Sequence, residues 1–107
     1  MTDDELLNDF LEAAKLEPDD PLVLYGLGNE YLKLRRYQEA IQTFTHLIEI
    51  QEDYSAAYRQ LGQAYAGIGD AAHAIQTYET GIQVATQKGD LQTRKEMEVF
   101  LNRLKKD

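Results

Sequence analysis

The stretch Leu27-Gly28-x-x-Tyr31 returns unchanged as Leu61-Gly62-x-x-Tyr65, thirty-four residues further along the chain. The same shift carries Ala40-Ile41-Gln42-Thr43 onto Ala74-Ile75-Gln76-Thr77. A fixed period of this length is typical of stacked copies of one small unit rather than of a single closed fold. Such arrays bury a core between neighbouring units and form extended surfaces that can hold partners.

Each unit is predicted to be a hairpin of two helices. The first helix of the first unit carries apolar and small residues on one helical face, namely Leu24, Leu27, Gly28 and Tyr31. A glycine inside a helix costs about 1 kcal/mol relative to alanine. Gly28 and Gly62 therefore predict points where a neighbouring helix approaches too closely for a side chain. We expect Ala40 and Ala74 to be the small partners opposite these two glycines.

The second helix of each unit also carries a single apolar stripe at helical spacing. Its members are Ile41, Phe44 and Ile48 in the first unit, and Ile75, Tyr78 and Ile82 in the second. The combined pattern resembles the tetratricopeptide repeat (TPR), whose signature is W-x2-L-G-x2-Y, A-x3-F and P. The matching positions are Leu27, Gly28, Tyr31, Ala40 and Phe44, with their copies Leu61, Gly62, Tyr65, Ala74 and Tyr78. The resemblance implies an all-α fold, a short right-handed superhelix of antiparallel hairpins.

The resemblance places one repeat at residues 21–54 and a second at 55–88. Residues 1–20 resemble the second helix of a further repeat, and Thr2-Asp3-Asp4-Glu5 is a capping-box pattern that would begin it. Residues 89–107 lack the repeat spacing and are predicted to form an end helix, polar outside and apolar inside. We therefore expect one domain, residues 1–107, with six helices, similar to the small stand-alone TPR proteins of bacteria.

Residues that favour helix ends divide these segments. Asp20 is predicted to cap a helix that has Pro21 at its first position. Asp70 follows Gly67-Ile68-Gly69 as another cap, and Lys88-Gly89-Asp90 combines a helix stop with a new start.

The composition and the N-terminal sequence argue against several classes of protein. The 107 residues include no cysteine, which excludes disulfides, thiolate catalysis and cysteine-type zinc sites. The sequence has no apolar run near the ~20 residues that a membrane helix requires. Acidic residues stand at the N-terminus where a secretory signal would have basic ones. These features predict a cytoplasmic protein that does not bind a membrane.

The net charge of −8 is unevenly distributed. Residues 1–20 carry eight acids against Lys15 alone, whereas residues 88–107 are net positive. Adaptation to high salt would favour a uniformly acidic surface. The uneven charge therefore weakens that explanation of the acidic composition. Nucleic acid is not an expected partner, because contacts to phosphates need clustered lysine and arginine side chains. The basic clusters Lys33-Arg35-Arg36 and Lys105-Lys106 are interpreted as exposed helix ends.

The sequence offers little for catalysis. His46 and His73 occupy different places in their repeats and have no third ligand in sequence reach, so no zinc site is predicted. Ser55 is interpreted as a cap or first-turn residue rather than a nucleophile. Gly67-Ile68-Gly69 lacks the strand, lysine and third glycine of a phosphate-binding loop. We predict no enzyme activity, no metal and no cofactor.

A second stripe lies beside the core stripe on the first helix of each unit. In TPR proteins this stripe resembles the concave wall that binds extended peptides or helices. The predicted binding residues are Tyr25, Asn29, Leu32, Arg59, Gln63 and, on the last helix, Arg94. Amides can pair with a peptide backbone, and arginine can bind a carboxylate through two donors.

Each of these residues also has a structural interpretation. Tyr25 and Leu32 could instead pack on the N-terminal helix, and Asn29 and Gln63 could be solvated. Arg59 could pair with Glu30 or another acid.

Some TPR domains clamp the terminal carboxylates of chaperone tails with two lysines, two asparagines and an arginine. Here Asn29 matches one asparagine, and Arg94 would match the arginine if the last helix kept register. Tyr25 and Asp90 stand where the lysines belong, and Gln60 where the second asparagine belongs. The sequence therefore does not favour a chaperone-tail clamp.

The leading hypothesis is a non-catalytic scaffold or adaptor that binds a peptide or protein segment in the concave groove. The alternative is a structural subunit that associates with itself through its terminal helices. In that case the Lys105-Lys106 end of one molecule would meet the Asp3-Asp4 end of another, or the N-terminal helix would be exchanged. The expected state is a monomer or a weak homo-oligomer.

Overall fold

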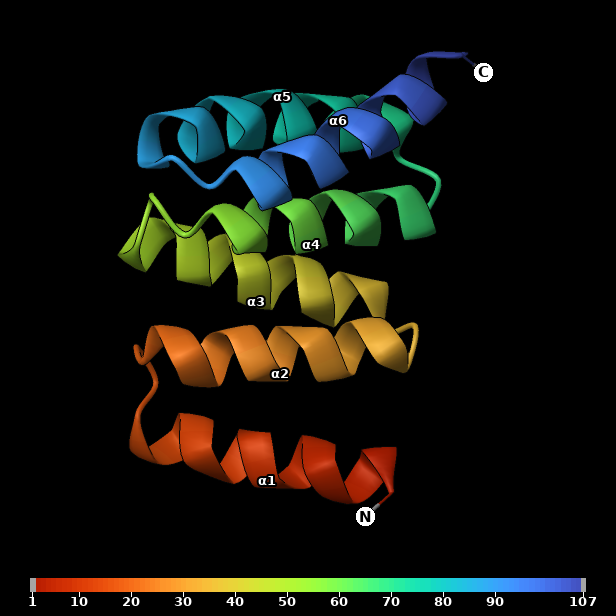
Figure 1. Ribbon diagram of the computed structural model, residues 1–107. Coiled ribbons are helices and arrows are strands. Elements are labelled where there is room, and N and C mark those ends of the chain that lie inside the picture. The colour runs from red at the N-terminus through yellow and green to blue at the C-terminus, as the bar shows by residue number, and fades with distance from the viewer. Residues whose placement is uncertain (1, 107) are drawn as a thin grey trace.

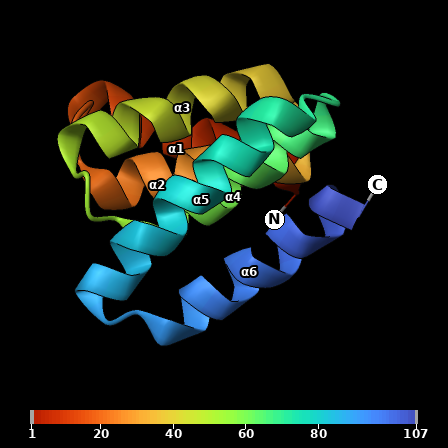
Figure 2. The same ribbon diagram turned by 90° about the horizontal axis from the view of Figure 1, so that it is seen from above.

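The computed structural model describes residues 2–106, which contain six helices and no strand. The helices are α1 (Asp3–Leu16), α2 (Pro21–Lys33), α3 (Tyr37–Ile50), α4 (Ser55–Gly67), α5 (Ala71–Lys88) and α6 (Leu91–Lys106). Each helix lies against the next in chain order, so the stack runs from α1 at one end to α5 and α6 at the other (Figure 1). The predicted all-α fold with six helices is confirmed. Seen from above, α4 and α5 cross the direction of α2 and α3, and α6 lies apart from the first hairpin (Figure 2).

Four of the helices begin after the capping residues that the sequence indicated. Thr2, Asp20, Asp70 and Asp90 each accept a hydrogen bond from a backbone N–H in the first turn that follows them. Gly89 ends α5 in the left-handed conformation, with φ of 79°. One detail differs in the predicted capping box. The Glu5 carboxylate accepts from the Thr2 hydroxyl at 3.1 Å instead of reaching back to a backbone N–H.

The repeat glycines lie beneath aromatic rings. A Cβ added to Gly28 would lie 2.6 Å from the ring of Phe44, and one added to Gly62 would lie 2.2 Å from the ring of Tyr78. The atoms nearest to each glycine thus belong to an aromatic ring and not to Ala40 or Ala74, which were expected opposite the glycines. Both alanines are fully buried, but the aromatic residue one turn further along the same helix reaches across to the glycine.

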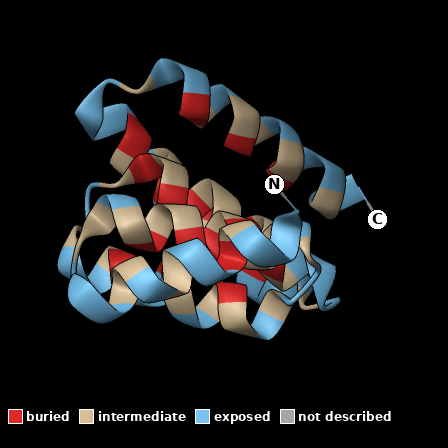
Figure 3. Ribbon diagram, turned by 90° about the horizontal axis from the view of Figure 1, so that it is seen from below, coloured by how far each residue is buried: buried red, intermediate tan, exposed pale blue. Residues whose placement is uncertain are grey.

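The core consists of two adjoining clusters. The first joins α2, α3 and α4 around Phe44 and Leu47, and the second joins α4, α5 and α6 around Tyr78 and Met97. Buried residues accordingly lie on the facing sides of the helices, while the outer sides are exposed (Figure 3). The apolar stripe predicted near the C-terminus lies in this second cluster, with Met97 fully buried.

Helix α1 contacts α2 alone. Its Phe10 ring lies where a Cβ on Gly26 would be, at 2.2 Å, so the ring-on-glycine contact occurs here too. Leu7 is the buried residue of this helix. The N-terminal helix therefore closes the open side of the first hairpin, as its apolar face indicated.

We predict that Gly62→Ala lowers the free energy of unfolding by about 1–3 kcal/mol, the usual cost of overpacking a core. Helix propensity acts in the opposite direction, since alanine gains about 1 kcal/mol over glycine. Urea denaturation of Gly62→Ala, of Tyr78→Leu and of the double variant would test the contact. The added methyl group should cost less stability when residue 78 is already leucine. A Gly62→Ala variant as stable as the wild type would contradict the close approach.

The Asp90 cap also links α4 to α6. Ser55, buried at the first position of α4, donates to Asp90 Oδ2 at 2.6 Å, and the Thr93 N–H donates to Oδ1 at 3.2 Å. The Ser55 and Thr93 hydrogen bonds hold the pKa of the Asp90 carboxyl below its ordinary value. Stability from this group is therefore present above the ordinary pKa, roughly pH 4, and is lost as the pH falls through the lower, folded-state pKa.

We predict that Asp90→Ala lowers the free energy of unfolding by about 1 kcal/mol at pH 7, as for other helix caps. The difference from the wild type should shrink as the pH falls below 4, because the wild-type carboxyl then takes up a proton. Urea denaturation at several pH values measures it, and Ser55→Ala should show the same trend with a smaller amplitude. A difference that stays constant from pH 7 to pH 3 would contradict the role of the charged cap.

Candidate partner-binding groove

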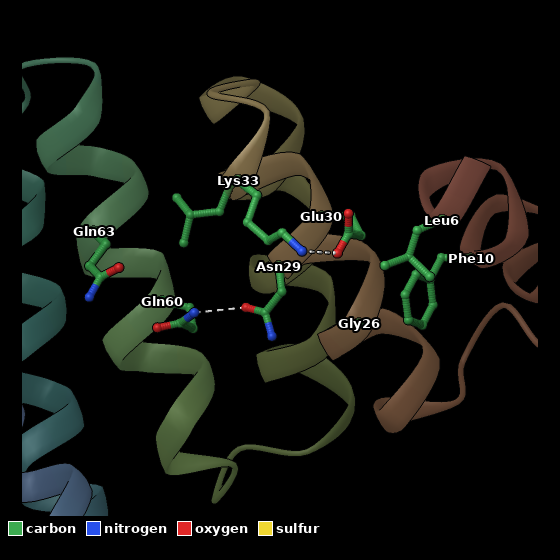
Figure 4. Close-up of a pocket in the computed structure, with 9 residues that line it drawn as sticks. Leu6, Phe10, Gly26, Asn29, Glu30, Lys33, Gln60 and Gln63 are labelled. Carbon is green, nitrogen blue, oxygen red and sulfur yellow. Dashed lines mark hydrogen bonds and ion pairs between the residues drawn. The ribbon is translucent and has the colours of Figure 1, made fainter. Parts of the chain in front are cut away.

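A groove of about 610 Å³ opens between α1, α2 and α4. Leu6 and Phe10 of α1 form one side, α2 forms the base, and Gln60 and Gln63 of α4 form the other side (Figure 4). The residues that α2 contributes are Gly26, Asn29, Glu30, Leu32 and Lys33. Three of the predicted binding residues, Asn29, Leu32 and Gln63, thus line one cavity.

Amide side chains form the polar part of this groove. The Gln60 Nε2 donates to Asn29 Oδ1 at 2.7 Å, joining the two first helices of the repeats. This bond uses one donor of Gln60 and one lone pair of Asn29, so each amide keeps capacity for another partner. Asn29, Gln60 and Gln63 are all half-buried, which places them between the core and solvent rather than fully in water.

Two predicted residues, Tyr25 and Arg59, form a brace beside the groove instead of lining it. The Tyr25 ring packs edge-on against Phe44, with centroids 6.2 Å apart, and against Tyr54 at 5.2 Å. Arg59 donates from Nη2 to the Tyr25 hydroxyl at 3.1 Å and from Nη1 to Glu96 of α6 at 2.5 Å. Tyr25 therefore packs against the first core cluster, and Arg59 pairs with Glu96, not with Glu30.

Because the Arg59 guanidinium already bonds to Glu96 and Tyr25, it is less available to bind a partner. Its side chain is only 21% exposed, and it connects α2, α4 and α6 through charged and neutral hydrogen bonds. Replacing it would loosen the contact between α4 and α6 as well as change the groove's charge.

Arg94 is not brought into the groove. It lies on α6, half-buried, with Nε 3.4 Å from Glu98 on the same helix. The prediction for Arg94 assumed that α6 keeps the 34-residue register that relates α2 to α4. Helix α6 starts at Leu91, outside the 34-residue spacing, and its core stripe is Met97 and Leu101.

Six residues that line the groove were not predicted from the sequence, and Glu30 is the most buried charged residue among them. It is only 4% exposed, its Oε1 accepts from Lys33 at 2.9 Å, and its Oε2 is buried with no hydrogen-bond partner. Lys33 also lies 3.7 Å from Asp3 of α1. The sequence does carry a signal for this residue: the equivalent position of the second unit is Ala64, so an acid at position 30 departs from the repeat.

A second hollow continues the same surface toward α6. It measures about 230 Å³ and is lined by Gln63, Ala66, Tyr78, Phe100, Arg103 and Leu104. Gln63 belongs to both hollows, so polar and apolar surface follows the inner sides of α2, α4 and α6.

Comparisons with known proteins agree with this architecture. A family described as YpiA-like tetratricopeptide repeats matches residues 7–52, and the tetratricopeptide repeat family matches residues 55–88. A TPR repeat-containing protein of Pseudomonas aeruginosa is 38% identical over 86 residues, which cover 80% of this chain and 82% of that protein. The chain belongs to the tetratricopeptide repeat family.

Two solved structures resemble nearly the whole stack. A Bordetella parapertussis protein is 30% identical with a TM-score of 0.84, over 94% of this chain and 88% of its own. The TPR2B domain of yeast Sti1, in a complex with pHsp70, has a TM-score of 0.88 at 18% identity. That match covers 94% of this chain and 80% of the yeast chain, and it shows the fold alone.

The two histidines of this TPR protein pair with single acids. His46 Nε2 lies 3.0 Å from Asp19 Oδ1, and His73 Nδ1 lies 2.7 Å from Asp70 Oδ2. Within residues 2–106 no three histidine or acidic side chains gather as metal ligands would. In the same range, none of the helices combines the length and apolar character that crossing a bilayer requires.

The unpartnered Glu30 oxygen gives a stability prediction. Leaving a buried polar atom unsatisfied costs about 1–3 kcal/mol, which offsets the apolar contacts that the Glu30 side chain makes. Lys33 keeps Asp3 as a partner when Glu30 is removed. We predict that Glu30→Ala stays within about 1 kcal/mol of the wild type in urea denaturation. A loss above about 2 kcal/mol would show that the carboxylate holds α1 on α2.

Proposed function

We propose that this TPR protein is a non-catalytic adaptor that holds a peptide or protein segment along the inner sides of α2, α4 and α6. The amide cluster Asn29, Gln60 and Gln63 carries the proposal, because it combines spare donors and acceptors with a groove of about 610 Å³. Such groups can pair with the backbone of an extended segment. Leu32 and Phe10 supply apolar area beside them.

The charges argue against a clamp for terminal carboxylates. Arg59 and Arg94 already pair with Glu96 and Glu98, and Lys33 with Glu30. Asp90, at one lysine place of that clamp, is the cap of α6. The yeast TPR2B domain is in a complex with pHsp70, but the likeness to it supports binding of a protein segment only, not the same chemistry.

Self-association remains the alternative proposal. The two ends of the stack are far apart in Figure 1, so an acidic α1 end meeting a basic α6 end would be a head-to-tail contact that can extend indefinitely. However, Lys105 already lies 3.4 Å from Glu79 in its own chain. The groove therefore has the stronger support.

A random twelve-residue peptide library displayed on phage tests the groove. We expect Asn29→Ala with Gln63→Ala to weaken binding of the selected peptides at least about fivefold, since two hydrogen bonds are lost at about 0.5–1.5 kcal/mol each. The matched control is Gln42→Ala with Gln76→Ala, which removes two exposed amides from α3 and α5. Fluorescence anisotropy with synthetic peptides measures both variants. Equal weakening by the two pairs, or by the control alone, would contradict a concave site.

A further inference from the structure

Glu30 occupies a position that the fold itself fills with alanine. Ala64, thirty-four residues later, is fully buried in the first core cluster. The second unit thus packs this point of α4 without a polar group, whereas α2 carries a carboxylate that is 4% exposed. A buried carboxylate needs hydrogen bonds to offset its desolvation. Packing of the repeat therefore gives no reason for an acid here.

The carboxylate is only half satisfied by the chain. Oε1 accepts from Lys33 at 2.9 Å, while Oε2 is buried and has no partner among residues 2–106. Glu30 is one of the residues that line the groove. Beside it, Lys33 is a long side chain that is 55% exposed and is shared with Asp3. The stem of Lys33 can change its rotamers while its ammonium group keeps Glu30 Oε1 and Asp3 as partners, and such a shift would expose Oε2 to the groove. Figure 4 shows the contact between Lys33 and Glu30.

The charges around this carboxylate favour a cation. Asp3, Lys33 and Glu30 together carry one net negative charge, and residues 1–20, which include α1, carry a net charge of −7. Next to the groove, Arg59 is held by Glu96. A positively charged group approaching from solvent is attracted by the α1 end before it makes any contact.

We propose that Glu30 is a recognition subsite for a basic side chain, arginine or lysine, of the segment bound in the groove. An N–H of the incoming cation donates to Glu30 Oε2, and Lys33 stays on Oε1 and Asp3. The aliphatic stem of the basic residue covers Leu6 and Leu32, which line the same groove. The proposal rests on the groove proposed above and adds the chemistry of the partner.

The test combines two changes, one on each molecule. Peptides selected from the display library are synthesised with their basic residue intact or replaced by citrulline, which keeps the shape of arginine without its charge. Binding of each peptide is measured to the wild type and to Glu30→Gln. The matched control is Glu49→Gln, which removes one exposed acid from α3 and changes the net charge equally.

We expect the selected peptides to share a basic residue at one position. The citrulline peptide should bind the wild type and Glu49→Gln at least about fivefold more weakly than the arginine peptide. On Glu30→Gln the two peptides should bind alike. In NMR spectra of the ¹⁵N-labelled protein, the arginine peptide should shift the Glu30 backbone amide more than the citrulline peptide does.

Each contrary result overturns either the Glu30 subsite alone or both proposals. Groove-dependent peptides without a shared basic residue, or with the same citrulline penalty on Glu30→Gln, overturn the Glu30 subsite and leave the adaptor function standing. Equal loss on Glu49→Gln also overturns the subsite, because the effect is then general charge. Peptides that ignore the Asn29 and Gln63 variant, or no selected peptide at all, overturn the groove and the subsite together. Circular dichroism of Glu30→Gln confirms that the variant is folded.

Discussion

The structure depends on an aromatic ring lying directly on a helix glycine. Phe44 on Gly28 and Tyr78 on Gly62 set the distance between the two helices of each hairpin, because no side chain fits between ring and backbone. Tyr78 and Phe44 are among the largest fully buried side chains, so each ring also supplies much of the core that its hairpin shares with the next. One contact thus fixes both the hairpin and the stacking, which explains why it repeats with the period of the sequence.

The same contact accounts for the two ends of the stack. Helix α1 places the ring of Phe10 on Gly26. Because Gly26 and Gly28 are only two residues apart, α2 is contacted by a ring on two different faces within one turn. At the other end Met97 replaces the ring, with its sulfur at the place where a Cβ on Gly81 would lie. A flexible thioether can fill a gap that no repeat geometry specifies. The ends are therefore closed by similar packing with different side chains.

The sequence predicted the fold well because periodic positions are dominated by local rules. Caps at Thr2, Asp20, Asp70 and Asp90 need only a side chain and the next turn, so they could be recognised without knowing the tertiary structure. The ring that lies nearest to each glycine was not predicted, because spacing identifies a helical face but not how far a side chain reaches across it.

The groove was predictable only where α2 and α4 keep the repeat register. Asn29 and Gln63 were found by their spacing, whereas Arg94 was misplaced because α6 leaves that register. Arg59 was predicted to bind a partner, with pairing to an acid as the alternative; it pairs with Glu96, which is 37 residues away in the sequence. Such long-range pairs depend on how α4 and α6 cross, and no local pattern specifies that crossing.

The internal pairing of the groove has a consequence for how it can bind. Gln60 and Asn29 hold each other at 2.7 Å, and the Arg59 brace fixes α2, α4 and α6 next to them. Amides that are already ordered lose little side-chain entropy when a partner arrives, so more of each new hydrogen bond appears as affinity. Glu30 differs from them, because one of its oxygens has no bond to exchange. A partner that satisfies this oxygen gains a hydrogen bond without breaking one, which makes position 30 the place where the groove can discriminate between segments of similar shape.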